Sequence, residues 1–275
     1  MDALRDETFR RITGLMHATV GLSFPDSKKP LVTSRLSARI QRIGLNGFDE
    51  YFDLISSNDD GGEFQMAVDL LTTNETYFFR EPAHFDLLER ELTRTRPRHV
   101  AVWSAASSFG DEAYSTAMLL ADLQQHGRIG SDWTVLGTDI SDRVLRSASE
   151  AVFPAERLSR VSTERLKRYC LRGEHESEGL VQIQDRLREH VRFGQLNLCQ
   201  EVDAIGPFDV IFLRNVLIYF DPPTKQAVVD RVLTRLRPGG LFFMGTAEGR
   251  VPCQTPLQML GPGAYRKVSD SAIKA

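Results

Sequence analysis

The spacing of hydrophobic residues divides the chain into two regions. Between Leu4 and about Asn74, apolar residues recur every three or four positions, and no segment alternates as a strand does. Two of the apolar faces are formed by Phe9, Ile12, Leu15 and Met16, and by Phe48, Tyr51, Phe52 and Ile55. This spacing predicts a small all-helical domain over residues 1–74.

From Arg98 onward, short apolar runs alternate with helical segments. The runs predict strands at about 99–104, 133–138, 191–197, 208–214 and 241–245, and helices at 111–125, 142–151 and 223–236. Repeated β-α units are typical of an α/β fold with a mostly parallel sheet. A final strand at 263–268 is expected to be antiparallel and at the sheet edge. The pattern predicts an α/β domain over 98–275, joined to the helices by a segment at 75–97.

The β-α rhythm breaks between about 153 and 192. A polar loop bounded by Gly173 and Gly179 separates two short apolar runs, of which the second is Leu180-Val181-Gln182-Ile183. Such a pattern is typical of a hairpin. We therefore expect a small β-subdomain inserted into the α/β core.

Polar residues follow several of the predicted strands directly. The first strand leads into Gly110-Asp111-Glu112, and the second ends at Asp139. In parallel α/β folds the carboxyl ends of the strands form the ligand site. A carboxylate such as Asp139 can accept hydrogen bonds from both hydroxyls of a ribose. The pattern predicts a nucleoside-type ligand at this edge of the sheet.

The loop around Gly110 discriminates between such ligands. A dinucleotide-dependent oxidoreductase carries G-x-G-x-x-G there, whereas this loop has one glycine followed by two carboxylates. The carboxylates of Asp111 and Glu112 would repel phosphate and suit a cationic ligand. S-adenosylmethionine, with a sulfonium, an ammonium and a ribose, has that character. Alternatively, the two residues only complement the dipole of the following helix.

Composition narrows the function classes further. The 275 residues are 41% hydrophobic and 26% charged, with a net charge of −3, which predicts an ordinary soluble protein without general attraction to nucleic acid. We see no secretory signal and no run long enough for membrane insertion. The scattered cysteines Cys170, Cys199 and Cys253 lack metal-ligand spacing. We expect a cytoplasmic protein without a metal.

A basic stripe lies on the predicted helix at about 32–43. Arg35, Arg39 and Arg42 share one helical face, Lys28 and Lys29 precede them, and no acidic residue occurs between Lys28 and Arg42. A stripe of one sign favours an acidic partner surface, so these arginines are candidates for substrate docking. The alternative is a solvated face that only keeps the domain soluble.

Four motifs in order resemble one family. They are Thr72-Thr73-Asn74-Glu75-Thr76-Tyr77-Phe78-Phe79-Arg80-Glu81, then Ser104-Ala105-Ala106 with Gly110-Asp111-Glu112 and Tyr114-Ser115, then Thr138-Asp139-Ile140, and Arg214-Asn215-Val216-Leu217-Ile218-Tyr219-Phe220. From about residue 10 to residue 268 the chain is similar to the CheR family of chemotaxis protein methyltransferases. The resemblance implies a helical N-terminal domain, a Rossmann-like seven-stranded methyltransferase core and an inserted antiparallel β-subdomain.

The resemblance also implies a reaction and a site. The family transfers a methyl group from S-adenosylmethionine to glutamate carboxylates in the helical cytoplasmic region of bacterial chemoreceptors, which gives γ-glutamyl methyl esters and S-adenosylhomocysteine during chemotactic adaptation. The cofactor contacts carried over are Asn74, Thr76, Arg80, Glu112, Asp139, Asn197, Leu198, Arg214 and Asn215. Arg80 and Tyr219 are the candidate catalytic residues, Tyr219 facing the transferred methyl. Alternatively, Arg80 forms a structural salt bridge and Tyr219 is a packed aromatic.

The chain departs from the family pattern at two places. Ala113 replaces a proline after the acidic pair, which removes a preset helix-start dihedral but keeps Glu112. The insert lacks the Gly-x-Gly-Pro turn of members that tether to a receptor's C-terminal pentapeptide, and Gln182 stands where a second arginine is expected. The loop carboxylates Glu174, Glu176 and Glu178 would repel an acidic peptide end. These departures argue against pentapeptide tethering.

The expected chemistry needs no general base, because a glutamate with a pKa of ~4.3 is ionised at neutral pH. Besides the oxidoreductase, two alternatives remain open from the residues. One is a non-catalytic adapter that uses the cofactor pocket as a sensor. The other is a methyltransferase for small molecules or nucleic acid, disfavoured by the absence of base-stacking motifs.

Overall fold

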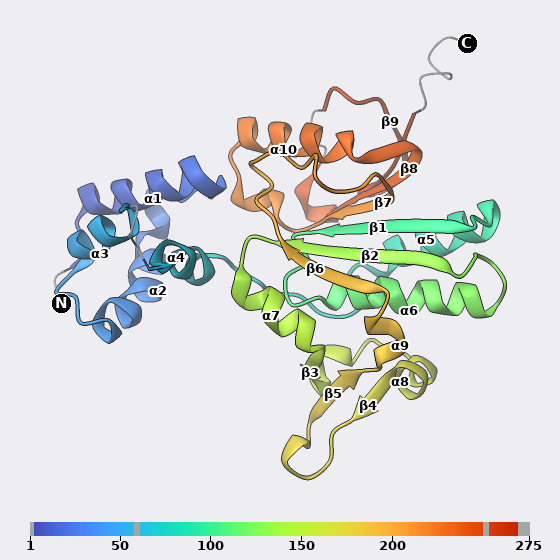
Figure 1. The fold of residues 1–275 in the computed structure, drawn as a ribbon. Helices are drawn as coiled ribbons and strands as arrows, with labels where there is room; N and C mark the ends of the chain where they lie inside the picture. Colours follow the sequence, from blue (N-terminus) through green and yellow to red (C-terminus); the bar gives the residue numbers. More distant parts are fainter. Residues whose placement is uncertain (1–2, 58–60, 250–252, 269–275) are drawn as a thin grey trace.

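The N-terminal region is all-helical in the computed structural model, which describes residues 3–57, 61–249 and 253–268. Its helices are α1 (Asp6–Val20), α2 (Lys29–Arg42), α3 (Phe48–Ile55) and α4 (Glu63–Leu71). Phe9, Ile12 and Met16 of α1 are buried, as are Phe48 and Tyr51 of α3. The helical periodicity therefore identified the core-facing sides correctly. In Figure 1 these helices form a lobe beside the sheet.

A mixed seven-stranded sheet forms the second region. Its strands are β1 (His99–Ala105), β2 (Asp132–Asp139), β6 (Val191–Gln195), β7 (Phe208–Leu213), β8 (Leu236–Met244), β9 (Leu257–Gly261) and β10 (Ala264–Lys267). The order is β6-β2-β1-β7-β8-β10-β9, and β6, β2, β1, β7 and β8 are parallel. The predicted fold class, an α/β Rossmann-like core, is confirmed.

The last strand corrects one expectation. The antiparallel strand expected at 263–268 is β10, but it does not lie at the edge, because β9 pairs with its outer side. Strand β9 was missed because its sequence, Leu-Gln-Met-Leu-Gly, is short, and Met259 within it is 70% exposed. An exposed edge strand has little alternation between buried and solvated positions, so periodicity does not reveal it.

Alternate residues of β1 contact different sides of the molecule. Ala101 and Trp103 pack into a core shared with the N-terminal helices and α10 (Pro222–Thr234). Val100 and Val102 pack into a second core with α5 (Pro82–Thr95) and α6 (Asp111–Gln125). Burial on both faces explains the continuous apolar runs of the central strands. The helical lobe is thereby joined to the sheet by a common hydrophobic core.

The inserted subdomain follows α7 (Asp142–Glu150) and is a three-stranded antiparallel sheet. Its strands, in the order β3-β5-β4, are β3 (Val152–Pro154), β5 (Leu180–Ile183) and β4 (Cys170–Arg172), with α8 (Thr163–Tyr169) between β3 and β4 and α9 (Asp185–Arg188) after β5. Asp122 of α6 accepts hydrogen bonds from Arg165, Arg168 and Tyr169 at 2.7, 2.7 and 2.6 Å. These bonds fasten the insert, at the bottom of Figure 1, to the core. Within the described ranges, no helix has the length and apolar character that a membrane crossing needs.

Candidate active site

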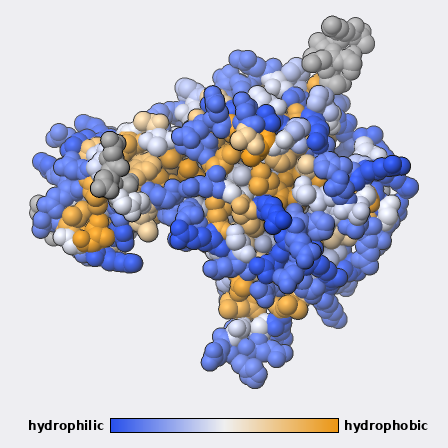
Figure 2. All heavy atoms as spheres, viewed as in Figure 1, coloured by the Kyte–Doolittle hydropathy of each residue, from blue (hydrophilic) through white to orange (hydrophobic). Residues whose placement is uncertain are grey.

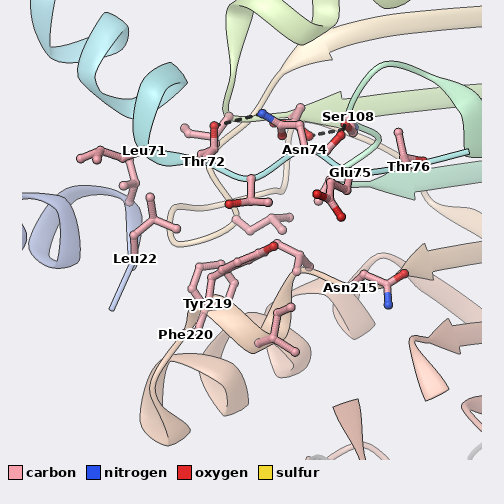
Figure 3. Close-up of a pocket in the computed structure, with 18 of the residues that line it drawn as sticks. Leu22, Leu71, Thr72, Asn74, Glu75, Thr76, Ser108, Asn215, Tyr219 and Phe220 are labelled. Atoms are coloured by element: carbon pink, nitrogen blue, oxygen red, sulfur yellow. Dashed lines mark hydrogen bonds between the residues drawn. The ribbon is translucent and has the colours of Figure 1, made fainter. Parts of the chain in front are cut away.

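A cavity of about 410 Å³ lies between the helical lobe and the carboxyl ends of the parallel strands. Pockets of this size bury most of a small ligand. Its walls come from the segment after α1, the linker at 71–76, the loops after β1, β2, β6 and β7, and the short 3-10 helix η4 (Leu217–Tyr219). Figure 3 shows the linker residues on one side of the space and Tyr219 and Phe220 on the other. Figure 2 shows apolar surface along the junction between the helical lobe and the core.

Hydrogen bonds within the linker, and between the linker and the loop after β1, fix the linker wall of the cavity. Asn74 donates from Nδ2 to Thr72 Oγ1 at 3.1 Å, and its backbone oxygen accepts from Ser108 Oγ at 3.1 Å (Figure 3). Asn74 and Thr76 both line the cavity. These bonds fix the position of the Asn74 side chain, including its amide oxygen.

The loop after β1 makes a tight turn over the cavity. Ala106 and Ser108 have φ values of +63° and +52°, and Gly110 has +89°. A Cβ on Gly110 would lie 2.9 Å from the ring of Phe193, so glycine is required both by the dihedral and by the close approach. The turn places the Ser108 backbone N–H next to the end of β2.

Asp139 accepts a hydrogen bond from the backbone N–H of Ser108. Its Oδ2 accepts from Ser108 N at 2.8 Å, and its Oδ1 accepts from Ser141 N at 3.0 Å. Burial raises the pKa of Asp139, although these backbone hydrogen bonds favour the charged form. A carboxylate offers about four acceptor positions, so each oxygen can take a further donor. Asp139 lines the cavity, with two acceptor oxygens fixed by the backbone.

Glu112 and Arg214 form a buried ion pair in the cavity wall. Arg214 donates from Nε to Glu112 Oε2 at 2.6 Å, and Ser104 donates to Glu112 Oε1 at 2.6 Å. The side chains of Arg214 and Glu112 are only 2% and 12% exposed. Arg214 also donates to the backbone oxygen of Arg80 at 2.7 Å, so one guanidinium joins the carboxylate to the linker.

Asp111 does not share the position of Glu112. It is fully buried, lies outside the cavity lining and forms an ion pair with Arg157 at 2.5 Å. Burial raises the pKa of Asp111 to about 6 despite the nearby guanidinium. Neighbouring residues on a helix point about 100° apart, so only one of the acidic pair can face the ligand. The interpretation that both carboxylates face a cationic ligand is wrong for Asp111.

Arg80 and Tyr219 both line the cavity, from the linker and from η4. Arg80 donates to the backbone oxygen of Glu75 at 2.9 Å, and it makes no ion pair with any residue that the structure describes. The alternative role of Arg80 in a salt bridge is therefore not seen. The backbone oxygen of Tyr219 accepts from Ser23 N at 2.9 Å, which joins η4 to the helical lobe.

Glu248 holds the segment that carries Tyr219, a role that the sequence did not indicate. Its Oε1 accepts from Leu217 N at 2.7 Å and its Oε2 accepts from Gly245 N at 2.8 Å. Burial raises the pKa of Glu248, opposed by these backbone hydrogen bonds. Asn215, whose φ is +59°, lies beside Gly245. One carboxylate thus fixes the turn between β7 and η4.

The predicted cofactor contacts all line this one cavity. Asn197 differs in that both ends of its amide are already used, since Nδ2 donates to Thr19 O at 2.7 Å and Oδ1 accepts from Cys199 N at 2.9 Å. Its side chain therefore ties the core to the helical lobe. Leu198 is 8% exposed and supplies apolar lining.

The arginines predicted for docking lie outside the cavity. Arg35 donates to the backbone oxygens of Leu71 and Thr72 at 2.8 and 3.0 Å. Arg39 donates to both oxygens of Glu63, at 2.9 and 2.6 Å. Arg42 is exposed and makes no ion pair in the described part of the chain. The stripe is thus partly used inside the helical lobe, which neither of the two interpretations anticipated.

Sequence reasoning missed the part of the cavity that the helical lobe supplies. These lining residues are Val20, Leu22, Ser23, Phe24, Pro25, Lys28 and Leu31. No periodicity or motif marks a loop between two helices as a ligand wall. Ser107 was also missed. It lines the cavity, and its buried hydroxyl has no hydrogen-bond partner among the described residues. A small polar residue after the first strand was the available signal.

Comparison with known proteins identifies the family. Residues 7–72 match the CheR methyltransferase all-alpha domain, and residues 74–261 match the CheR methyltransferase SAM-binding domain. The chain is 39% identical over 269 residues to the chemotaxis protein methyltransferase of Escherichia coli, covering 98% of this chain and 93% of that protein. It is 39% identical to chemotaxis protein methyltransferase 2 of Pseudomonas aeruginosa, with coverage of 94% and 92%. A solved bacterial Hen1 methyltransferase domain is also similar, at 16% identity and a TM-score of 0.35 over 58% of this chain and 63% of that one. The chain belongs to the CheR methyltransferase family.

Proposed function

We propose that this protein transfers a methyl group from S-adenosylmethionine to glutamate side chains of bacterial chemoreceptors, forming γ-glutamyl methyl esters and S-adenosylhomocysteine. The observation that carries the proposal is that one cavity gathers Asn74, Glu112 and Asp139 with Arg80 and Tyr219. Relatives named chemotaxis protein methyltransferases match it over nearly their full length. The cytoplasmic helical region of a receptor is the proposed partner.

The cavity residues fit the donor chemically. The spare acceptor positions of Asp139 suit the two hydroxyls of a ribose, which are donors. Glu112 presents a carboxylate suited to an ammonium group, while Arg214 offsets part of its charge. The unpartnered hydroxyl of Ser107 offers one further polar contact. Asn74 and Thr76 would complete the polar wall from the linker.

S-adenosylmethionine, when bound, supplies an electrophilic methyl on a sulfonium. The accepting glutamate is already ionised at neutral pH, with a reference pKa of ~4.3, so no residue of this chain has to remove a proton. The task of the protein is to hold a carboxylate in line with that methyl and to keep water out. Orientation of this kind can contribute about 7–11 kcal/mol to a barrier reduction.

Arg80 is the proposed orienting residue for the glutamate carboxylate. A guanidinium can bind a carboxylate through two parallel hydrogen bonds, and Arg80 has no competing carboxylate partner in the described structure. Tyr219 is proposed to face the methyl group from the opposite wall (Figure 3). Both side chains sit on segments whose backbones are tied down, Arg80 by Arg214 and the η4 segment of Tyr219 by Glu248.

Tethering to a receptor pentapeptide is not part of the proposal. The loop between β4 and β5 exposes Glu174, Glu176 and Glu178. A peptide ending in acidic groups would meet like charge there. We therefore propose that this protein reaches its receptor through other surfaces.

Groups of three or more metal-ligating side chains do not occur within the ranges that the structure describes.

The test is methyl-ester formation on receptor-containing membranes with tritiated S-adenosylmethionine. Arg80→Ala is expected to reduce the rate strongly while the unfolding transition stays near that of the wild type. Arg128→Ala, at an exposed arginine after α6, is the matched control and should behave as wild type. Equal rates for Arg80→Ala and the wild type would remove Arg80 from the reaction. No ester with any receptor would refute the proposed function.

A further inference from the structure

Two aromatic rings beside the cavity each carry two guanidinium groups. The Arg160 and Arg80 guanidiniums lie 4.7 and 5.9 Å from the centre of the Tyr77 ring. Those of Arg157 and Arg143 lie 4.7 and 5.4 Å from the centre of Phe109. We call this set the arginine–aromatic band; its members are Tyr77, Arg80, Phe109, Arg143, Arg157 and Arg160.

The band is continuous with the active-site cavity. Arg80 is both a member of the band and a cavity-lining residue. The backbone oxygen of Arg157 accepts from Phe78 N at 3.3 Å, which joins the insert side of the band to the linker side. Phe109 belongs to the loop that delivers Ser108 to Asp139. A segment bound along the band would therefore end at the cavity.

The band carries positive charge that the fold does not use. Arg157 is neutralised by Asp111. In residues 3–57, 61–249 and 253–268, Arg80, Arg143 and Arg160 form no ion pair, and Arg143 and Arg160 are exposed. Among acidic residues near them in sequence, Asp142 is paired with Arg146 and Glu81 lies beside His84 and Arg214, while Glu75, Glu156 and Glu164 are exposed. Three guanidiniums of the band are therefore not neutralised by an ion pair within the described residues.

Stacking prepares these arginines for carboxylates. A guanidinium held over an aromatic ring keeps its N–H groups free at its edge while losing rotamer freedom in advance. Binding a carboxylate then costs less side-chain entropy than it would for a free surface arginine. Arginine in this setting can also bind a carboxylate with two hydrogen bonds, which lysine cannot.

We propose that Arg143 and Arg160 of the arginine–aromatic band bind the carboxylates that flank the methyl-accepting glutamate on an acidic helical segment of the receptor, while Arg80 orients the accepting glutamate itself. The inference rests on the proposed function and specifies which surface selects the substrate. It places selection on α7 and the inserted subdomain, in contrast to the α2 stripe, where Arg35 and Arg39 are engaged inside the lobe. The preferred substrate is then a glutamate that has further acidic residues near it on the same helical segment.

The experiment compares a charge-reversed band with a matched control. The variant Arg143→Glu/Arg160→Glu leaves Arg80 and the cavity intact. The control Arg98→Glu/Arg128→Glu makes the same charge change at exposed arginines that flank β1 and α6 away from the cavity. The probes are two fluorescent helical peptides with one central glutamate, flanked in one by glutamates and in the other by glutamines. Binding is followed by anisotropy at low and high salt, and S-adenosylhomocysteine affinity by calorimetry.

The wild type and the control should bind the glutamate-flanked peptide about tenfold more tightly than the glutamine-flanked one at low salt, with the preference reduced at high salt. The band variant should lose that preference while its S-adenosylhomocysteine affinity is unchanged. A band variant that retains the preference, or a wild type that has none, overturns the proposal. These results are independent of turnover, so absent methyl transfer with intact peptide preference would instead refute the proposed function.

Discussion

Arg214 donates from Nε to Glu112 Oε2 at 2.6 Å and from Nη1 to the backbone oxygen of Arg80 at 2.7 Å. The β7 end, the α6 start and the linker are thereby held by one guanidinium that is 2% exposed. His84 lies behind it, with Nδ1 3.4 Å from Arg214 Nη1 and Nε2 2.9 Å from the backbone oxygen of Pro262. Burial lowers the pKa of His84, which keeps the imidazole neutral beside the guanidinium. Arg214 therefore supports both Glu112, which lines the cavity, and the backbone of Arg80, the candidate catalytic residue.

Replacing Arg214 with Met should destabilise the fold and weaken binding of S-adenosylhomocysteine. Loss of the guanidinium leaves the Glu112 carboxylate buried without its cation, a change that costs about 3–5 kcal/mol of folding free energy. Urea unfolding measures that loss, and calorimetry with S-adenosylhomocysteine should show weaker binding. Arg214→Lys, which keeps the charge but not the fork, should fall between. Unfolding free energies within about 0.5 kcal/mol of the wild type would contradict the role given to this pair.

Glu248→Gln should lower the rate of methyl transfer more than it lowers the affinity for the cofactor. The amide keeps one acceptor oxygen but turns an N–H donor toward a backbone N–H, so the turn carrying Tyr219 loses one of its fixed contacts. A misplacement of about 1 Å in such a site can lower kcat about a hundredfold. Steady-state kinetics should show a fall in kcat with a smaller change in S-adenosylhomocysteine affinity. Parallel losses in both would indicate a general structural effect.

Asp111→Asn should reduce the dependence of stability on pH. Burial raises the pKa of Asp111 to about 6, so between about pH 4 and about pH 6 the folded protein keeps a proton that the unfolded chain releases. The stabilisation is complete below about pH 4 and is lost as the pH rises to about 6, with a span of at most about 3 kcal/mol. Unfolding free energies measured across this range should fall less in the variant. An identical pH dependence in both proteins would exclude Asp111 as the titrating group.

The α2 arginines should respond differently to charge reversal. Arg39→Glu sets a second carboxylate against Glu63, which is 6% exposed and also accepts from Tyr51 at 2.9 Å. We expect a loss of about 3–5 kcal/mol in stability. Arg42→Glu, at an exposed position, should change stability by less than about 0.5 kcal/mol. If α2 docks on the receptor, Arg42→Glu raises the substrate KM; an unchanged KM leaves Arg42 a solvated surface residue.

Sequence patterns predicted the helices, the strands and the residues at the strand ends. The apolar spacing of α1 and α3, the continuous runs of β1 and β7 and the residues at the strand ends follow from burial on one or both faces. The sheet order confirms the predicted fold class, and the family matches confirm the predicted family. Most of the predicted ranges agree closely with the structure, and α6 begins and ends at the predicted residues. The exception is β8, which begins at Leu236 rather than at 241, within the range predicted as helix.

Pairings between distant residues were not accessible in the same way. Arg39 and Glu63 are 24 positions apart, and Arg157 and Asp111 are 46 apart, so the charge pattern could not show that these groups neutralise one another. The cavity wall from Val20 to Lys28 depends on how the helical lobe packs on the sheet. The support that Glu248 gives to η4 is a side-chain contact with backbone, which leaves no periodic signal.

Methyl transfer to carboxylates in this cavity is tested most directly by incubation with methyl-tritiated S-adenosylmethionine and chemoreceptor membranes, followed by mild alkali and collection of volatile methanol. We expect alkali-labile label that mass spectrometry locates on receptor glutamates, and we expect Asp139→Asn to lose this label because it binds the cofactor more weakly. Label that resists alkali, or label that persists undiminished in Asp139→Asn, would rule out methyl-ester formation in this cavity.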